Sequence, residues 1–320
     1  MKALKSAALL GVLALGAVSL SACTDDMNAS SGAGEKSTEV KAVGLMVQDL
    51  GNPFFNSMKN GVESAAKDLG ATFTAQDGRQ DLAAQNDQID AFIQQGIDVL
   101  LINAVDSEGV GPAVQRARDA GITVVAVDVG AKNAEATVTT DNVQAGRLAC
   151  ESLIEQIGGK GEILIVDGTP TTSIQDRVTG CEEALAEAPE VTVAGKQNGD
   201  NGREKALTLT TDMLTASPGI VGIFGVNDPS ALGANLAAQQ AGMNDLIITG
   251  VDGSPEAVDE MGKGTSMFKG TAAQDPNLLG STALEMAVKL RSGETLDNDT
   301  VLVPSSIVDA SNLADYKGWQ

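Results

Sequence analysis

Histidine is absent from this sequence of 320 residues. It is the commonest general base and the commonest metal ligand, so its absence removes every His-based catalytic triad and argues against a metal centre. Basic residues are also scarce, with 21 Lys and Arg against 43 Asp and Glu. Nucleic-acid binding needs clustered Lys and Arg to neutralise phosphates, so nucleic acid is not an expected partner. The nucleotide-binding P-loop and Gly-rich fingerprints are missing too, and no cofactor is expected.

The N-terminus has the features of a bacterial secretion signal. Lys2 and Lys5 precede the apolar segment Ala7–Val18, which is too short to span a bilayer. The next residues, Leu20-Ser21-Ala22-Cys23, resemble the lipobox of bacterial lipoproteins, whose cysteine is acylated and becomes the first residue. An ordinary cleaved signal followed by a chance cysteine is the alternative. We expect a signal peptide over residues 1–22, a lipid anchor on Cys23, and a location in the periplasm or at the cell surface.

The two remaining cysteines, Cys150 and Cys181, form an even pair in an oxidising compartment if Cys23 carries lipid. They do not have the C-x-x-C spacing of a redox or zinc site. A structural disulfide is the prediction, and two separately buried thiols are the alternative.

After a polar, small-residue tether over residues 23–39, the chain alternates short apolar runs with helical patterns. Asn56–Leu69 and Gly109–Ala120 carry apolar residues at helical spacing. The apolar runs do not alternate with polar residues, as expected for strands buried on both faces of a parallel sheet. Examples of these runs are Val43–Val47, Val99–Ile102, Thr123–Val127, Glu162–Val166, Ile220–Phe224 and Leu246–Thr249. The order of strand and helix predicts an α/β fold.

An internal repeat indicates two similar lobes. Gly96–Asn103 leads through a helical segment to Val124–Asp128, and Gly219–Phe224 leads in the same way to Ile247–Asp252. Four polar residues follow apolar runs in this repeat: Asn103, Asp128, Asn227 and Asp252. Ligands bind at the carboxyl ends of strands in such sheets, so the four are predicted to converge on one cleft. Capping of the following helices and turns is the alternative.

A set of short motifs occurs in a fixed order from about Val40 to the C-terminus. These motifs are Asn52-Pro53-Phe54-Phe55, Asn103, Asp128, Thr140-Asp141-Asn142, Arg177 before Gly180, Asn227-Asp228, Val251-Asp252-Gly253 and Gln274. In their order and spacing the chain resembles the ribose-binding-protein-like branch of the periplasmic binding proteins of type 1, the substrate-binding components of ABC importers.

The resemblance implies two doubly wound parallel-sheet lobes joined by a three-segment hinge. The crossings fall near Thr140–Asp141, Gln274–Asp275 and Val303–Ser305. The first lobe is then 40–140 with 275–303, and the second is 141–274 with 304–320. The ligand-binding residues that it implies are Asn52, Phe54, Phe55, Asn103 and Asp128 from the first lobe, and Arg177, Asn227, Asp252 and Gln274 from the second lobe or hinge.

These residue types suit a sugar. Each hydroxyl both donates and accepts a hydrogen bond, and Asp, Asn, Gln and Arg can satisfy it, while the phenylalanine rings pack on its C–H faces. The chain departs from ribose binders at four positions. Val129 stands in place of an arginine, Asn201 and Val251 in place of aromatics, and Gln48 in place of a small polar residue. Gln48 and Asn201 are therefore added to the predicted site, and a sugar alcohol or differently shaped polyol is favoured over ribose.

The predicted function is delivery of a small sugar or sugar alcohol to the membrane permease of an ABC importer, by a monomer. A ligand sensor for a membrane receptor is the alternative, because the same lobes would serve it. A secreted sugar-modifying enzyme that uses Asp128 and Asp252 as paired carboxylates is less favoured, since both aspartates are explained as hydroxyl acceptors.

Overall fold

The computed structural model describes residues 38–319. The expected signal peptide, Cys23 and residues 23–37 of the expected tether lie outside the described residues. Within 38–319, none of the helices has the length and apolar character needed to cross a bilayer.

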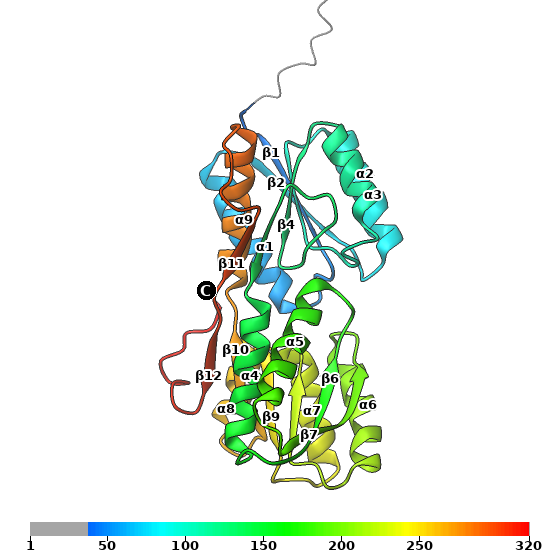
Figure 1. Ribbon diagram of the computed structural model, residues 1–320. Helices are drawn as coiled ribbons and strands as arrows, with labels where there is room; N and C mark the ends of the chain where they lie inside the picture. The colour runs from blue at the N-terminus through cyan, green and yellow to red at the C-terminus, as the bar shows by residue number, and fades with distance from the viewer. Residues whose placement is uncertain (1–37, 320) are drawn as a thin grey trace, which may run out of the picture. The chain divides into compact units, whose positions relative to one another are not determined.

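The first lobe is built on a parallel sheet with strand order β11-β5-β4-β3-β1-β2. Helices α1 and α9 pack together on one side of it, and α2 and α3 pack together on the other (Figure 1). The strands are β1 (Ala42–Val47), β2 (Thr72–Asp77), β3 (Val99–Ile102), β4 (Thr123–Val127), β5 (Ala136–Thr140) and β11 (Thr300–Val303). The helices are α1 (Pro53–Asp68), α2 (Leu82–Gln95), α3 (Gly111–Asp119) and α9 (Pro276–Arg291). Strands β3 and β4 are buried along their whole length, as their unbroken apolar runs predict.

The second lobe repeats this architecture, with strand order β12-β10-β9-β8-β6-β7. Its pairings are parallel except that of β12 with β10, which is antiparallel. The strands are β6 (Gly161–Asp167), β7 (Val191–Asn198), β8 (Gly222–Gly225), β9 (Ile247–Asp252), β10 (Phe268–Ala273) and β12 (Ser306–Asp309). The helices are α4 (Asn142–Gln156), α5 (Thr172–Ala186), α6 (Arg203–Ala216), α7 (Asp228–Gln240) and α8 (Pro255–Gly262). Helix α4 packs on α5, and α6 packs on α7.

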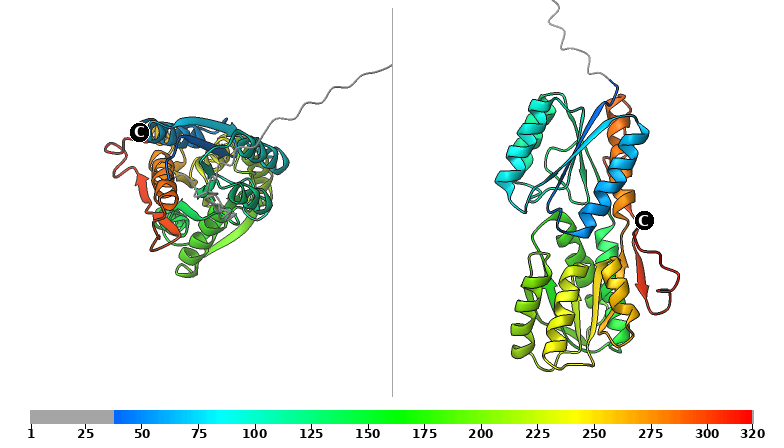
Figure 2. Two further views of the ribbon diagram at one scale, coloured as in Figure 1. Left: turned by 90° about the horizontal axis from the view of Figure 1, so that it is seen from above. Right: turned by 180° about the vertical axis from the view of Figure 1, so that it is seen from behind.

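Three segments carry the chain between the two sheets: β5 to α4, β10 to α9, and β11 to β12. Figures 1 and 2 show them side by side at one edge of the lobes. Hydrogen bonds join them, from Asp141 N to Val303 O (2.8 Å) and from Ser305 Oγ to Ala273 O (2.8 Å). The three-segment hinge of the periplasmic binding protein fold is therefore present.

Helix starts direct polar side chains toward the space between the lobes. Asn52 caps α1 and Asn227 caps α7, each through its side-chain oxygen, and a proline follows in the first turn of both helices. Proline suits this place because the first helical N–H groups have no partner within the helix. The chain thus fixes where α1 and α7 begin, and both begin beside the cavity described next.

Candidate ligand-binding site

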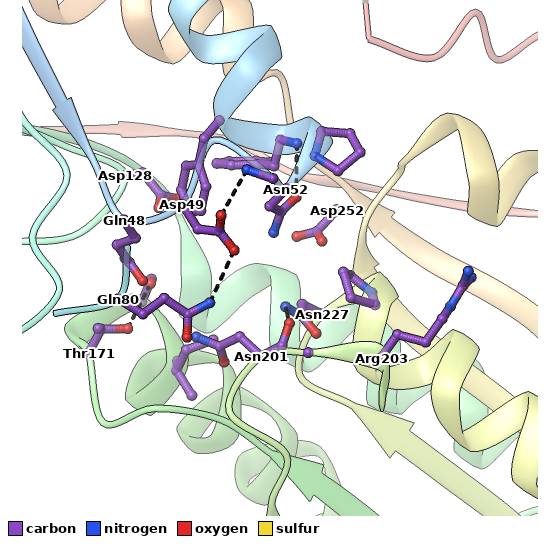
Figure 3. Close-up of a pocket in the computed structure, with 18 of the residues that line it drawn as sticks. Gln48, Asp49, Asn52, Gln80, Asp128, Thr171, Asn201, Arg203, Asn227 and Asp252 are labelled. Atoms are coloured by element: carbon purple, nitrogen blue, oxygen red, sulfur yellow. Dashed lines mark hydrogen bonds between the residues drawn. The ribbon is translucent and has the colours of Figure 1, made fainter. Parts of the chain in front are cut away.

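A cavity of about 240 Å³ lies between the lobes, at the carboxyl ends of strands in both sheets. Figure 3 shows Asp49 and Asn52 on one side of this space and Asn201, Asn227 and Arg203 on the other. Pockets for drug-sized ligands usually measure about 300–1,000 Å³, so this one suits a small ligand. The lining residues are Gln48, Asp49, Gly51, Asn52, Pro53, Phe54, Phe55, Gln80, Asp128, Thr171, Ser173, Ile174, Arg177, Asn201, Gly202, Arg203, Asn227, Pro229, Asp252, Glu256 and Gln274.

Every ligand-binding residue expected from the sequence lines this cavity except Asn103. Asn103 is completely buried and lies behind Asp128. Its Nδ2 donates to Asp128 Oδ2 (2.8 Å) and to Val127 O (3.1 Å), and its Oδ1 accepts from Gln48 N (3.2 Å). The expected direct contact of Asn103 with a ligand is therefore replaced by a positioning role, in which it orients the Asp128 carboxylate.

Asp128 and Asp252 occupy the same place in their two lobes, directly after β4 and at the end of β9. Both have positive φ angles, 68° for Asp128 and 142° for Asp252. Such backbone conformations are strained for residues with a side chain and cluster at functional sites. With this backbone conformation in both lobes, one carboxylate from each lobe lies at the same cavity.

Capping and lining are not exclusive here. Asn52 Oδ1 accepts from Phe54 N (3.0 Å) and Asn227 Oδ1 accepts from Ser230 N (2.9 Å), so both residues cap helices while they line the cavity. Asp128 caps no helix, and Asp252 is not an N-cap residue, although its Oδ2 accepts from the first N–H of α7, that of Asp228 (3.2 Å). Of the two alternatives, helix capping and cavity lining, Asn227 therefore does both, and Asp128 and Asp252 line the cavity.

Arg177 on α5 is the buried cation of the site. Its Nη1 lies 3.4 Å from Asp252 Oδ1 and donates to Val226 O (2.9 Å), while its Nε donates to Asn142 Oδ1 (2.9 Å). Gln274 Nε2 also donates to Asp252 Oδ1 (2.8 Å), and Gln274 Oε1 accepts from Thr140 Oγ1 (2.6 Å). A continuous hydrogen-bond chain thus runs from the hinge through Gln274 to Asp252.

Burial dominates the electrostatics of the carboxyl groups. It raises the pKa of Asp128 to about 6, although the charge of Arg177 and the hydrogen bond from Asn103 act in the opposite direction. Burial likewise raises the pKa of Asp252 to about 8, with Arg177 lowering it and the neighbouring Asp228 raising it. Asp228 is itself fully buried behind Asp252, and burial raises its pKa to about 6 despite hydrogen bonds from Thr271 and Ser254. The site holds more acid than the single buried cation can balance.

The apolar side of the cavity comes from α1. Phe54 and Phe55 pack edge to face, with ring centroids 5.5 Å apart. Beyond them, Trp319 packs edge to face on Phe54 at 5.5 Å, and its Nε1 donates to Asp252 O (2.9 Å). The two phenylalanines are the aromatic members of the lining, so ring packing on a ligand is one-sided.

Several lining residues were not predicted from the sequence, among them Asp49, Gln80, Thr171, Ser173, Arg203 and Glu256. They share a location in the loops and first helical turns that follow β1, β2, β6, β7 and β9. The rule that ligands bind at the carboxyl ends of parallel strands points to these loops. Applied to every strand of both sheets, this rule predicts these loop residues as part of the site.

Away from the cavity, Cys150 on α4 and Cys181 on α5 are joined by a disulfide, with their Cα atoms 5.1 Å apart. Within the described residues, no group of three or more Cys, Asp or Glu side chains is arranged to hold a metal ion.

Known proteins are similar to this chain in both sequence and fold. The sequence model of one protein family, the periplasmic binding protein domain, matches residues 43–295. The ribose import binding protein RbsB of Bacillus subtilis is 33% identical over 82% of this chain and 85% of its own length. The xylitol-binding protein of Mycolicibacterium smegmatis is 29% identical over 86% of this chain and 80% of its own. A solute-binding protein of an ABC transporter from Mycobacterium smegmatis, solved with glycerol, is 30% identical with a TM-score of 0.83, and the match covers 88% of this chain and 98% of that one. The chain belongs to the periplasmic binding protein family.

Proposed function

We propose that this protein is the extracytoplasmic substrate-binding component of an ABC importer and binds a small sugar or sugar alcohol between its lobes. The observation that carries the proposal is one small cavity lined by buried hydrogen-bonding side chains from both lobes. Asp128 on one lobe and Arg177 and Asp252 on the other can bond ligand hydroxyls only while the lobes face each other across the ligand. Ligand binding is then coupled to closure of the lobes, and a permease can distinguish the closed, liganded protein from the open one.

The ligand class follows from the lining. Carboxylate, guanidinium and amide groups line the cavity with two phenylalanine rings on one side only. Val129 and Val251, which replace polar or aromatic residues of ribose binders, pack into the apolar cores and leave no ring opposite Phe54 and Phe55. This one-sided lining supports a polyol that needs less ring stacking than ribose. The similar proteins named for ribose and for xylitol support a ligand in the range from a small sugar to a sugar alcohol.

A ligand screen tests this proposal. The purified protein is heated with pentoses, hexoses, tetritols, pentitols and inositols, and hits are titrated calorimetrically. A ligand at one hundred times its dissociation constant adds about 2.7 kcal/mol of stability, which gives a visible shift in Tm. Absence of any stabilising sugar or polyol across the screen would overturn the proposed ligand class.

Attachment to the membrane is a further part of the proposal. The Leu20-Ser21-Ala22-Cys23 pattern supports acylation of Cys23, which would hold a monomeric binding protein near its permease. Each buried methylene of an acyl chain adds about 0.8 kcal/mol, so two or three chains give stable anchoring.

A further inference from the structure

The charged residues of the cavity do not balance. Four acids line it, Asp49, Asp128, Asp252 and Glu256, against the two cations Arg177 and Arg203. Arg203 pairs with Glu256 at 2.5 Å at the exposed rim, and Arg177 lies nearest Asp252. The remaining buried acid is Asp128, which forms no ion pair with any of the described residues.

Asp252 and Asp128 differ in how completely the protein satisfies them. Asp252 Oδ1 accepts from Arg177 and Gln274, and its Oδ2 accepts from the backbone N–H of Asp228. Asp128 Oδ2 accepts from Asn103, but its Oδ1 has no hydrogen-bond partner among the described residues. Asp128 is only 5% exposed. A buried carboxylate oxygen without a donor is unfavourable, so a ligand that places a donor against Asp128 gains free energy by satisfying it.

The other buried unpartnered atom of the lining, Asn201 Oδ1, lies against the backbone of Gly168, where an added Cβ would collide with it, so it does not call for a ligand donor. Asp128 differs because its unpartnered oxygen belongs to a carboxyl group that lines the cavity from the first lobe (Figure 3). The group that satisfies a buried carboxylate best is rich in donors and positively charged, and an ammonium has three donors and no acceptor.

We propose that Asp128 forms a subsite for a protonated amine, so that the preferred ligand is an amino polyol or amino sugar. The inference rests on the proposed function, because it names the ligand class for the same cavity. The ammonium of the ligand supplies the direct ion pair that Asp128 does not form with any described residue, although the charge of Arg177 acts on Asp128 from a longer distance. Asp252, already satisfied by Arg177 and Gln274, serves hydroxyl groups of the ligand.

Matched ligand pairs test the subsite. The probes are ribitol, glucitol and myo-inositol, each compared by calorimetry at pH 7 with the analogue in which one hydroxyl is replaced by an amine. For the pair that fits the cavity, we expect the amine to bind at least about tenfold more tightly than its neutral partner, since an ammonium brings a full opposite charge to the buried carboxylate and a hydroxyl does not.

The Asp128→Asn variant locates the effect. It keeps the shape of the side chain and removes its charge, so the ratio of dissociation constants within the pair should fall to near one. Glu63→Gln, on the exposed face of α1, removes the same charge away from the cavity and should leave the ratio unchanged. Repeating the titration at 1 M salt separates a local pair from the attraction of the acidic surface, because the Debye length is then only about 3 Å.

The outcomes are distinguishable. If a neutral polyol binds wild type as tightly as its amine or more so, the amine subsite is overturned and the proposed function stands. An amine preference that survives Asp128→Asn overturns the assignment to Asp128, and one that vanishes in 1 M salt overturns a local pair. If no probe and no compound in the wider sugar screen binds, the proposed function itself has failed.

Discussion

At the residue scale, the site depends on buried polar side chains from both lobes that line one cavity. Asp128 and Arg177 lie on opposite lobes and are 5% and 4% exposed. Replacing either by alanine leaves polar groups of the ligand unpaired in a buried site. We expect Asp128→Ala and Arg177→Ala each to weaken binding by about thirty- to a thousandfold, roughly 2–4 kcal/mol.

Phe54→Ala provides the comparison for these two variants. It removes packing without stranding a polar group, so its cost in affinity should be smaller. Calorimetric titration of the screened ligand measures all three, with thermal melts to show that each variant is folded. Wild-type affinity in both Asp128→Ala and Arg177→Ala would mean that the two residues only support the fold.

Strand ends, recognisable as polar residues after apolar runs, pointed to Asn103, Asp128, Asn227 and Asp252, and the resemblance to ribose-binding proteins supplied the other predicted site residues. Sequence reasoning could not separate Asn103 from Asp128, since both follow such runs. The difference arises from packing, which places the Asn103 amide beneath the Asp128 carboxylate and away from the cavity. It could not foresee Trp319 either, because a residue near the C-terminus carries no strand-end signal.

The raised pKa of Asp252 predicts how stability depends on pH. Burial brings that pKa to about 8, whereas an unfolded aspartate has a pKa near 3.9. Between these values the folded state binds more protons than the unfolded state, so the free energy of unfolding should fall as pH rises. Asp128 and Asp228, at about 6, contribute mainly below pH 6. Because the chain has no histidine, Asp252 dominates between pH 6 and 8.

We therefore expect the unliganded protein to melt at a higher temperature at pH 6 than at pH 8.5. Asp252→Asn should flatten this slope, and Glu63→Gln should not. Thermal melts in matched buffers give the answer, and an equally steep slope in Asp252→Asn would contradict the prediction.

At the element scale, strands with unbroken apolar runs were predicted well, and strands that contain polar residues were not, which include the internal strands β5 and β10 as well as edge strands. The runs over Val99–Ile102 and Thr123–Val127 coincide with β3 and β4, which are buried on both faces. Strand β2 lies at a sheet edge and has no fully buried residue, so its sequence carries no apolar run. Strand β7, at the edge of the other sheet, is exposed along most of its length for the same reason.

Helices α4 and α5 touch backbone to backbone through glycine. A Cβ atom on Gly146 would lie 2.0 Å from Arg177 O, and one on Gly180 would lie 1.9 Å from Val143 O. Alanine normally favours a helix over glycine by about 1 kcal/mol. At Gly146 and Gly180 the clash outweighs this helix preference, because the added Cβ meets backbone oxygens and no flexible side chain can move away. Alanine is therefore expected to destabilise the protein at both positions.

Gly146→Ala should therefore lower the free energy of unfolding by about 1–3 kcal/mol. It should also weaken ligand binding, because α5 carries Arg177. Gly219→Ala is the control, since a Cβ there meets nothing within 4 Å. Denaturant melts and calorimetry measure both effects. Equal stability of the two variants would show that α4 and α5 can separate at little cost.

At the scale of the whole molecule, the N-terminal pattern predicts where the protein resides. Expressed in its bacterial host, Cys23→Ala should be released from the membrane or remain unprocessed, because the acylated residue is lost. Detergent partitioning of wild type and variant reads this directly, with a ligand thermal shift to confirm that both are folded. Equal partitioning of the two proteins into detergent would refute lipid anchoring.

The lobes also communicate through the C-terminal segment. Trp319 is the one tryptophan of the chain. Its ring packs on Phe54 of the first lobe, while its Nε1 donates to Asp252 O in the second lobe, and the nearby Tyr316 hydroxyl donates to Gly253 O (2.9 Å). A second link between the lobes runs from Gly130 N to Thr172 Oγ1 (2.8 Å). If the lobes separate, the contact between Trp319 and Phe54 breaks and the indole becomes more exposed to water.

Tryptophan emission should therefore report closure. Saturation with a ligand found in the screen should shift the emission to shorter wavelength and reduce quenching by acrylamide, since closure buries the indole against Phe54. Trp319→Phe should lose the signal while calorimetry still detects binding, because the variant keeps an aromatic ring beside Phe54. If calorimetry shows saturation of wild type and the emission and quenching do not change, Trp319 stays in place during binding and the lobes do not part at this contact.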